Sequence, residues 1–270
     1  MLDQLTGSSR LYPIIGDPIT FVESPVWLTQ SFARRGHPGL CIPMQVPLDA
    51  LDAVMVGLAA TPNVDGILVT MPHKHAAFGY CATVSDRARR LGVVSIMRRS
   101  ADGTWHGDML DGLAFVKAQV DHGATVEGAR ALLIGAGGAG SAIADSLLAA
   151  GVGELVIHDA DPGRVDAVRA MVAGSGVAAG ERVSRGTNDP TGFDLVFNAT
   201  PLGMADTDPL PLDASLLSAS TFVGDVIAGH GTTPLVAAAR AAGCGTATGA
   251  NMVEAAQDLM VDFLMVGERP

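Results

Sequence analysis

Short apolar runs alternate with segments of helical period along the first part of the chain. Apolar runs occur at 11–15, 40–46 and 66–70, and the intervening segments 25–35 and 48–60 repeat their apolar residues every three to four positions. Short runs bounded by Gly, Pro or Asp predict buried strands, and their alternation with helices is typical of βαβ units. The pattern therefore predicts an α/β protein with a mostly parallel sheet.

A second series of apolar runs begins after a polar stretch. We predict strands at 131–134, 155–158, 195–198 and 221–226, each followed by a turn-rich or helical segment. The polar, turn-forming stretch 98–107 separates this series from the first and indicates a domain boundary. The restart of the strand and helix pattern predicts a second α/β domain.

The predicted division gives the last helix to the first domain. Residues 111–119 have the pattern of a connecting helix, and residues 252–265 form a long amphipathic helix that we expect to pack back on the first domain. We therefore predict a substrate and catalytic domain of residues 1–107 plus 250–270. A dinucleotide-binding domain of residues 108–249 completes the chain.

The composition excludes several classes of protein. The chain has 270 residues, of which 48% are hydrophobic and 17% charged, enough for a sizeable buried core. It carries 17 basic and 28 acidic residues and no basic cluster, which argues against a nucleic-acid partner. The longest uncharged runs, such as 131–144, are shorter than the roughly 18 residues of a membrane span, and residues 1–10 lack a signal-peptide pattern.

The cysteines indicate the compartment. Cys41, Cys81 and Cys244 form an odd set at unrelated spacings, which supports neither a disulfide framework nor a paired metal site. Cysteines without disulfide partners favour a reducing cytoplasm. We further expect a monomer or homodimer that binds a small-molecule substrate and no metal.

The segment 132–142, with sequence LLIGAGGAGSA, places a glycine-rich turn between a predicted strand and a predicted helix. Gly135 permits the tight turn, Gly137 lets the backbone approach a pyrophosphate, and Gly140 allows close packing of helix on strand. The helix N-terminus then holds the anion through its free N–H groups. The predicted dinucleotide contacts in this loop are Gly135, Ala136, Gly137, Gly138 and Ala139.

Asp159 ends the next predicted strand, about 20 residues after the loop. A carboxylate at that place accepts hydrogen bonds from both ribose hydroxyls and repels a 2′-phosphate, so NAD is expected rather than NADP. Arg164 lies further on rather than beside it. Two alternatives stay open: a glycine-rich turn without a ligand, and Asp159 as a plain N-cap for a helix beginning near Pro162.

Several short strings in one order resemble the shikimate and quinate dehydrogenase family over nearly the whole chain. They are GDPI at 16–19 followed by ESP at 23–25, VTMPHK at 69–74, GDMLDG at 107–112, NATPLGM at 198–204, Asp225, and GANM at 249–252. The resemblance implies a two-domain oxidoreductase, with a cleft between an N-terminal α/β substrate domain and a Rossmann-type domain, that moves a hydride between NAD(P) and a secondary alcohol.

The resemblance also implies that Lys74 and Asp111 form the catalytic pair. A lysine with a lowered pKa can take the hydroxyl proton as the hydride leaves, whereas an arginine cannot. Of the 17 basic residues only Lys74 and Lys117 are lysines. From the residues alone, Lys74 could equally be a solvated residue at a helix start, and Asp111 a helix N-cap. Further cofactor contacts implied by the resemblance are Asn198, Thr200, Val226, Gly249 and Met252.

The departures from the family pattern cluster at the implied substrate contacts. Only Ser24 and Thr70 keep the family's residue type there. Apolar or smaller residues replace polar ones at the other positions, namely Val22, Leu68, Ser95, Met109, Leu110, Ala228 and Ala256, while Gln257 lies one place from an expected glutamine. A hydrogen bond contributes about 0.5 to 1.5 kcal/mol net, so losing about five would weaken shikimate binding by several kcal/mol.

We therefore expect a substrate other than shikimate. The alternatives are a true shikimate or quinate dehydrogenase and, in another class, a non-catalytic NAD-binding sensor or scaffold. His73, His75 and His230 lie near the implied site, but their spacing does not match a zinc site, and we interpret each as a surface or loop residue.

Overall fold

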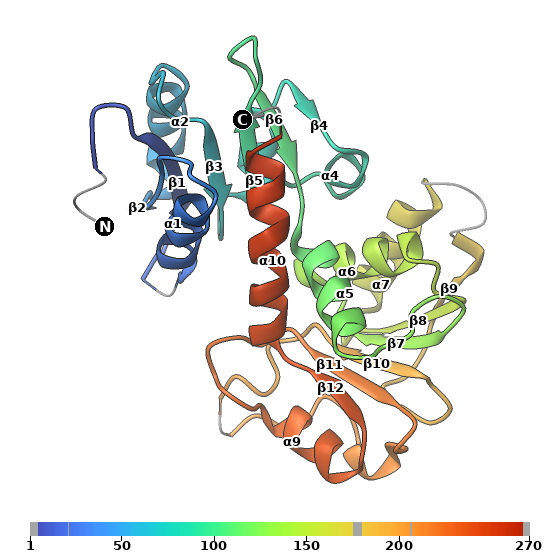
Figure 1. Ribbon diagram of the computed structural model, residues 1–270. Helices are drawn as coiled ribbons and strands as arrows, with labels where there is room; N and C mark the ends of the chain where they lie inside the picture. The colour runs from blue at the N-terminus through green and yellow to red at the C-terminus, as the bar shows by residue number, and fades with distance from the viewer. Residues whose placement is uncertain (1–4, 21, 175–179, 206, 267–270) are drawn as a thin grey trace. The chain divides into compact units, whose positions relative to one another are not determined.

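Two compact units make up the protein in the computed structural model, which describes residues 5–20, 22–174, 180–205 and 207–266 (Figure 1). The first unit spans residues 1–110 and 257–270, and the second spans residues 111–256. Each unit has its own six-stranded sheet.

The sheet of the first unit is mixed, with strand order β2-β1-β3-β5-β6-β4. Its strands are β1 (Arg10–Gly16), β2 (Gly39–Gln45), β3 (Gly66–Val69), β4 (Thr83–Val84), β5 (Ile96–Arg99) and β6 (Trp105–Asp108). The three predicted strands are present and pair in parallel, whereas β5 runs antiparallel to β3 and β6. The helices are α1 (Ser24–Arg34), α2 (Leu51–Ala59) with the 3₁₀ turn η2 (Leu48–Ala50) before it, α3 (Lys74–Phe78) and α4 (Asp86–Leu91).

The stretch 98–107, predicted as a turn-forming boundary, is instead part of a β-hairpin. Strands β5 and β6 pair antiparallel through it, and only the few residues between Arg99 and Trp105 form a turn. The polar residues of this hairpin include Arg99, whose charged side chain is hydrogen-bonded within the first unit. The Arg99 guanidinium donates hydrogen bonds to five backbone carbonyl oxygens and stacks on the Trp105 ring at 4.4 Å.

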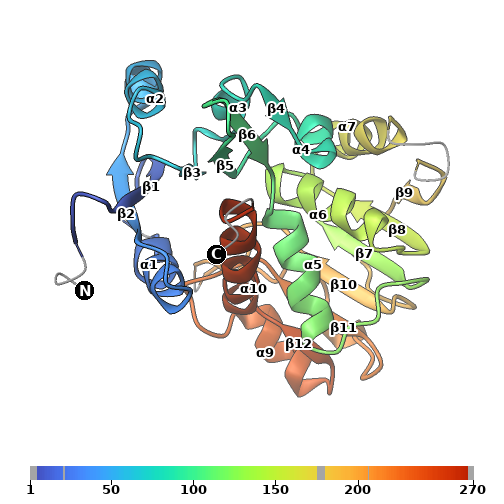
Figure 2. The same ribbon diagram turned by 45° about the horizontal axis from the view of Figure 1, so that its top comes forward.

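The sheet of the second unit is wholly parallel, with strand order β12-β11-β10-β7-β8-β9. Its strands are β7 (Arg130–Ile134), β8 (Glu154–His158), β9 (Val183–Arg185), β10 (Leu195–Asn198), β11 (Phe222–Asp225) and β12 (Gly245–Ala247). Helices α5 (Asp111–Asp121), α6 (Gly138–Ala149), α7 (Pro162–Ala173) and α9 (Pro234–Ala241) belong to this unit, with the 3₁₀ turn η3 (Ala214–Leu216) (Figure 2). Helix α10 (Gly249–Leu264) begins in it, and its residues from 257 belong to the first unit.

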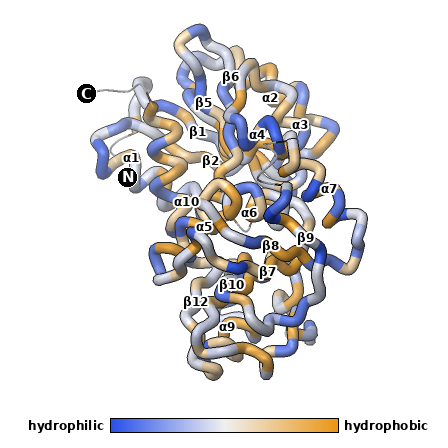
Figure 3. The backbone as a smooth tube through the Cα atoms, turned by 90° about the vertical axis from the view of Figure 1, so that its right-hand side faces the viewer, coloured by the Kyte–Doolittle hydropathy of each residue, from blue (hydrophilic) through white to orange (hydrophobic). Residues whose placement is uncertain are grey.

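Alternate residues of each central strand bury against opposite layers of helices. Leu133 and Phe197 join one apolar cluster with residues of α5, α6 and α7, while Leu132 and Val196 join another with residues of α9. Strands covered on both faces are apolar along their covered length, which is the pattern of 131–134 and 195–197 (Figure 3). The order of strands reverses direction between β7 and β10, where ligands bind in open parallel sheets.

Helices α5 and α6 pack closely because Gly112 has no side chain. A Cβ atom on Gly112 would lie 2.0 Å from the carbonyl oxygen of Ala142 and 2.6 Å from Oγ of Ser146. Since a backbone atom cannot move aside, the helices themselves would have to separate.

Replacing Gly112 with Ala is therefore expected to destabilise the second unit by about 1–3 kcal/mol, the usual cost of overpacking. Urea unfolding followed by far-ultraviolet circular dichroism measures this, because both tryptophans, Trp27 and Trp105, lie in the first unit. The matched control is Gly138→Ala, since a Cβ at Gly138 meets no atom within 4 Å. Equal stability of the two variants would contradict the packing argument.

Candidate functional site

The turn between β7 and α6 has two kinds of glycine. Gly135 has a φ of 104°, and a Cβ there would lie 2.8 Å from the carbonyl carbon of Ala199. A Cβ on Gly140 would lie 2.0 Å from the carbonyl oxygen of Gly135. These two glycines are needed by the fold of the turn itself.

Gly137 and Gly138 differ, since a Cβ on either would meet no atom within 4 Å. The open space lies at the start of α6, whose N-cap, Gly137, supplies no side chain to the first N–H groups. Unsatisfied backbone donors at a helix N-terminus bind anions. The loop therefore fits the pyrophosphate of a dinucleotide, with Gly137, Gly138 and Ala139 as the residues that would hold it.

Asp159 lies directly after β8 and contacts this loop. Its carboxylate accepts hydrogen bonds from the backbone N–H of Ala136 at 2.7 Å and of Asp161 at 2.9 Å. Burial acts to raise the pKa of Asp159, but these two N–H groups outweigh it, with help from Arg164, so the pKa is below its ordinary value. Asp159 is therefore ionised beside the glycine loop.

The N-cap of α7 is a different residue. Asp161 accepts a hydrogen bond from the backbone N–H of Gly163 at 2.9 Å and caps the helix that begins at Pro162. The alternative that Asp159 serves as this cap is wrong. Arg164 lies 3.9 Å from Asp161, so the nearby cation is paired with the capping residue.

A buried polar network closes the ends of β10 and β11. Asn198 donates hydrogen bonds to Asp225 at 3.1 Å and to the carbonyl of Leu202 at 3.2 Å, and its carbonyl oxygen accepts from the Thr200 hydroxyl at 2.6 Å. Asn198 thus fixes the loop that follows β10. Its predicted contact with the cofactor, and that of Thr200, stay predictions.

Asp225 extends this network to α9. It accepts hydrogen bonds from the hydroxyl of Thr233 at 2.6 Å and from the N–H of Ile227 at 3.2 Å. Burial raises the pKa of Asp225 above its ordinary value, although these donors act in the opposite direction. Thr233 is also the N-cap of α9, so one hydroxyl joins the helix start to the strand end.

The start of α10 packs on the loop after β11. A Cβ on Gly249 would lie 2.3 Å from the carbonyl carbon of Ile227. Val226 and Met252 are half-buried against the core of the second unit, and Ala228 is exposed. Gly249 therefore allows the close approach of helix and loop, and contacts of these residues with a cofactor stay predictions.

The predicted substrate residues of the first unit gather at one edge of its sheet. Thr70 follows β3, and its N–H donates to the carbonyl of Ile15 at 2.9 Å. Its side chain packs on Gly16, where a Cβ would lie 2.3 Å from the Thr70 methyl carbon. Val22 and Ser24 follow β1 and are half-buried. Parallel pairing of β1 and β3 brings these segments together.

Lys74 is the first residue of α3 and its side chain is half-buried. Its carbonyl oxygen accepts a hydrogen bond from the N–H of Val94 at 3.1 Å. Asp111 is the first residue of α5, in the second unit. The pairing of Lys74 with Asp111 stays a prediction.

Two of the substituted positions are closed by the first unit's own packing. Leu68 lies in β3, paired with Ile14 and Ile96, and is 1% exposed. Ser95 is 3% exposed, and its hydroxyl oxygen accepts a hydrogen bond from the N–H of Leu110 at 3.0 Å. Farther along α10, Ala256 is buried and Gln257 half-buried.

Two features of the first unit were not predicted from the sequence, the bonding of Asp108 and the burial of His73. Asp108 accepts hydrogen bonds from Arg87, from the hydroxyl of Ser85 and from the N–H of Met109, which fixes the chain just before Asp111. His73 lies in the turn before α3 and is fully buried, so it is a loop residue but not a surface one, whereas His75 and His230 are exposed.

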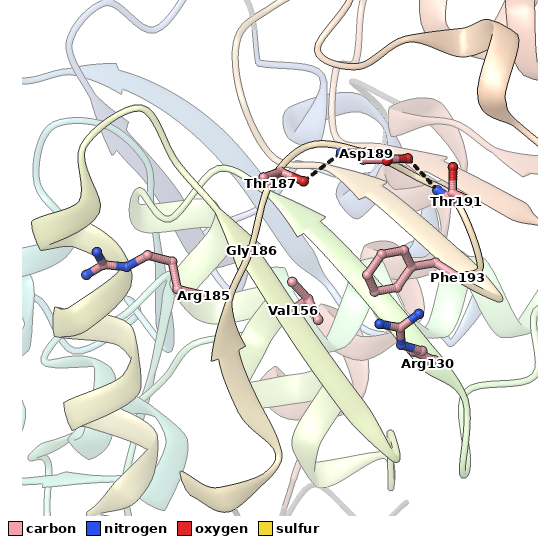
Figure 4. A pocket seen from close by; sticks show the side chains of 8 residues that line it. All are labelled: Arg130, Val156, Arg185, Gly186, Thr187, Asp189, Thr191 and Phe193. Carbon is pink, nitrogen blue, oxygen red and sulfur yellow. Dashed lines mark hydrogen bonds between the residues drawn. The ribbon is translucent and has the colours of Figure 1, made fainter.

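A cavity of about 310 Å³ opens elsewhere on the second unit (Figure 4). It is lined by Arg130, Val156, Arg185, Gly186, Thr187, Asp189, Thr191 and Phe193, none of which is a predicted site residue. Its two cations are paired, Arg130 with Glu154 and Arg185 with Asp166, each at 2.6 Å.

Within the described residues, no cluster of His, Cys, Asp or Glu side chains could hold a metal ion. In the same part of the chain, no helix has the length and apolar character needed to cross a membrane.

Comparison with known proteins finds a matching family model and relatives in sequence and in structure. Residues 14–97 match the family model described as the shikimate dehydrogenase substrate binding domain. The chain is 36% identical over 236 residues to a shikimate dehydrogenase (NADP(+)) of Stenotrophomonas maltophilia, which covers 86% of this chain and 82% of that relative.

Two solved structures are similar over almost their whole length. A ligand-free 5-ketofructose reductase of Gluconobacter sp. has a TM-score of 0.87 and 25% identity, covering 96% of this chain and 93% of that one. A quinate dehydrogenase from Corynebacterium glutamicum in complex with NAD has a TM-score of 0.86 and 26% identity, covering 96% and 95%.

The network around Asp225 is expected to control the stability of the second unit. Thr233→Val removes both the helix cap and a donor to a buried carboxyl, so the free energy of unfolding should fall by about 2–3 kcal/mol. Thr233→Ser keeps the hydroxyl and should lose less than half as much. Urea unfolding followed by circular dichroism measures both, and an equal loss in the two variants would contradict the dominant role of the hydroxyl, since Thr233→Ser keeps that group and Thr233→Val does not.

Proposed function

The chain belongs to the shikimate dehydrogenase family and is an NAD(P)-dependent oxidoreductase that acts on a CH–OH group; we propose that its substrate is a secondary alcohol or ketone less polar than shikimate. One observation carries the substrate proposal. At the edge of the sheet that holds Thr70 and Lys74, Leu68 is buried in the strand and the Ser95 hydroxyl already accepts the N–H of Leu110. These two positions therefore contribute few hydrogen-bonding groups for the hydroxyls of a polyhydroxylated ring.

A related protein supports a different substrate in this fold. The 5-ketofructose reductase that the chain resembles is named for a ketone other than a shikimate derivative. The curated relative named for shikimate favours the second candidate, ordinary shikimate or quinate oxidation. The two candidates differ in the polarity of the substrate, which can be measured directly.

Within this proposal, NAD is the preferred cofactor. Gly137 and Gly138 would hold the pyrophosphate, and ionised Asp159 at the end of β8 would accept hydrogen bonds from the ribose hydroxyls. The same negative charge opposes a 2′-phosphate. When bound, the nicotinamide supplies or accepts the hydride. The curated relative is named for NADP(+), whereas the quinate dehydrogenase was solved with NAD.

The proposed proton transfer depends on Lys74. As the substrate alcohol is oxidised, its hydroxyl proton moves to the neutral amine Nζ of Lys74, and in the reverse direction the ammonium returns it to the carbonyl oxygen. Asp111 would orient the ammonium and the substrate hydroxyl. Thr70 and Ser24, which keep their hydroxyls at the same sheet edge, would position the substrate.

The substrate proposal is tested by cofactor reduction with purified protein. NAD and NADP are crossed with shikimate, quinate and a panel of less polar cyclic and short-chain secondary alcohols. We expect kcat/KM for the best alcohol to exceed that for shikimate by at least about 100-fold, because several polar contacts are missing. Robust shikimate or quinate turnover would overturn the proposal in favour of the second candidate. Tight NAD binding with no turnover of any alcohol would favour a sensor.

The role of Lys74 is tested with Lys74→Met, which keeps the length of the side chain and removes its amine. Turnover of the best alcohol should fall by about 100-fold or more, while NAD affinity stays within about twofold, because the lost group transfers a proton. Lys117→Met is the matched control, since Lys117 pairs with Asp121 on the surface of α5. Unaltered turnover in Lys74→Met would remove this lysine from the mechanism.

The cofactor preference is tested with Asp159→Ala. The variant should bind NAD about tenfold more weakly, because two hydrogen bonds to the ribose hydroxyls are lost. It should also prefer NAD over NADP by a smaller factor, because the charge that repels the 2′-phosphate is removed. Asp166→Ala removes an exposed acidic residue of α7 and should leave both affinities unchanged. Titration of NADH and NADPH by fluorescence gives the values. Tighter NADPH than NADH binding in the unmodified protein would contradict the preference.

A further inference from the structure

His73 is a polar side chain in the interior of the first unit with only half of its hydrogen-bonding capacity used. It is 0% exposed, its Nε2 lies 2.7 Å from the carbonyl oxygen of Val46, and its Nδ1 has no partner. A carbonyl oxygen only accepts, so Nε2 carries the proton and donates. Leaving Nδ1 unpaired in the interior costs free energy, which calls for an explanation.

Packing alone does not explain a histidine here. A phenylalanine ring has a similar size and would fill the same volume without the unpaired nitrogen. Helix capping does not explain it either, because His73 occupies the N-cap position of α3 but its side chain makes no capping bond. What the imidazole alone provides is the bond to Val46.

That bond joins the ends of three parallel strands. Val46 follows β2, and its own N–H donates to the carbonyl of Gly16, the last residue of β1, at 3.0 Å. His73 belongs to the turn after β3. The single bond from Nε2 therefore ties the β3 turn to a site already tied to β1, in the strand order β2-β1-β3.

Lys74 depends on this attachment because α3 cannot hold itself. The helix has five residues, Lys74–Phe78, too few for a helix to be stable on its own. Lys74 is its first residue, with its carbonyl held by the N–H of Val94, and His73 is the residue directly before it. The backbone before Lys74 is held locally, since the N–H of His73 donates to the carbonyl of Thr70 at 3.0 Å and its carbonyl accepts from Ala77 at 2.8 Å. The His73 side chain adds the bond that ties this turn to the segment after β2.

We propose that His73 is a positioning residue for Lys74: its Nε2–H bond to Val46 fixes the start of α3 and so the direction in which the lysine side chain leaves the backbone. The proposal rests on the proposed function of Lys74 as the group that moves the proton. It assigns no contact between His73 and substrate. Misplacing a reacting group by about 1 Å can reduce a rate by about 100-fold, so a buried bond that fixes Lys74 has a functional reason.

The test uses three variants that separate ring packing from the hydrogen bond. His73→Gln can place an amide N–H near the position of Nε2 and keep the bond to Val46. His73→Asn is shorter and cannot reach it, and His73→Phe keeps the ring but has no donor. Thermal unfolding followed by circular dichroism first checks that each variant is folded.

The readout is the nuclear magnetic resonance signal of Lys74 after reductive ¹³C-methylation of the full chain. Only the N-terminal amine, Lys74 and Lys117 are labelled, and Lys74→Arg identifies the signal. We expect His73→Phe and His73→Asn to change the chemical shift and titration midpoint of Lys74, with the Lys117 signal unchanged as an internal control. His73→Gln should resemble the unmodified protein.

Two results would overturn the proposal. One is a folded His73→Phe protein whose Lys74 signal superimposes on that of the unmodified protein. The other is a His73→Gln signal displaced as far as that of His73→Phe, which would assign the effect to the ring. If His73→Phe does not fold, the comparison of Gln with Asn decides the same question, and equal Lys74 signals in those two variants overturn the proposal.

Turnover of the best alcohol from the substrate panel gives a second readout. His73→Phe should lower kcat about tenfold with KM within about twofold, and His73→Gln should recover most of kcat, because the lysine is misplaced while substrate contacts remain. The proposed function has its own point of failure, which is retained turnover in Lys74→Met. The Lys74 signal decides the role of His73 whether or not any alcohol is oxidised.

Discussion

Parallel pairing of strands is the constraint on which the candidate residues of each unit depend. It brings the carboxyl ends of neighbouring strands to one edge of a sheet, so short segments from distant parts of the chain meet there. In the second unit the glycine loop follows β7, Asp159 follows β8, and Asn198 ends β10. In the first unit the segments carrying Ser24 and Lys74 follow β1 and β3.

The polar groups at these edges fall into two kinds. Asn198, Asp225 and Thr233 bond to one another and to nearby backbone, so the network holds loops in place and has few free partners. The start of α6 is the opposite case, because its N-cap makes no side-chain hydrogen bond and a Cβ on Gly137 or Gly138 would meet no atom within 4 Å. A network whose polar groups are all hydrogen-bonded supports the loops, whereas backbone N–H groups without a partner can bind an anion. His73 lies between the two kinds, with one nitrogen bonded and one not.

The sequence predicted a structural feature correctly wherever a few neighbouring residues determine that feature. The glycine loop, Asp159 after its strand and the central strands of both sheets follow from steric and periodic patterns of a few residues. The hairpin at 96–108 was missed because its polar residues are bonded to carbonyl groups up to about forty positions away, as Arg99 is. The burial of His73 was missed for the same reason, since its partner Val46 lies 27 positions earlier. Which hydrogen bond a polar side chain makes depends on the tertiary fold.

The candidate residues of the two units differ in what can change. The glycine loop presents backbone N–H groups, which every residue type carries, and its shape is set by glycines whose replacement would strike backbone atoms. The proposed cofactor site is therefore tied to the fold itself and leaves little room for substitution. The sheet edge around Thr70 works through side chains, and a change such as Leu68 or Ser95 alters what is offered to a ligand without disturbing the strands, since both are accommodated in the packing. Under the proposed function, the hydride chemistry and Lys74 are kept while the substrate changes. The anchoring of Lys74 uses backbone groups and the His73 side chain, and no side chain of the proposed substrate residues, which is what makes that separation physically possible.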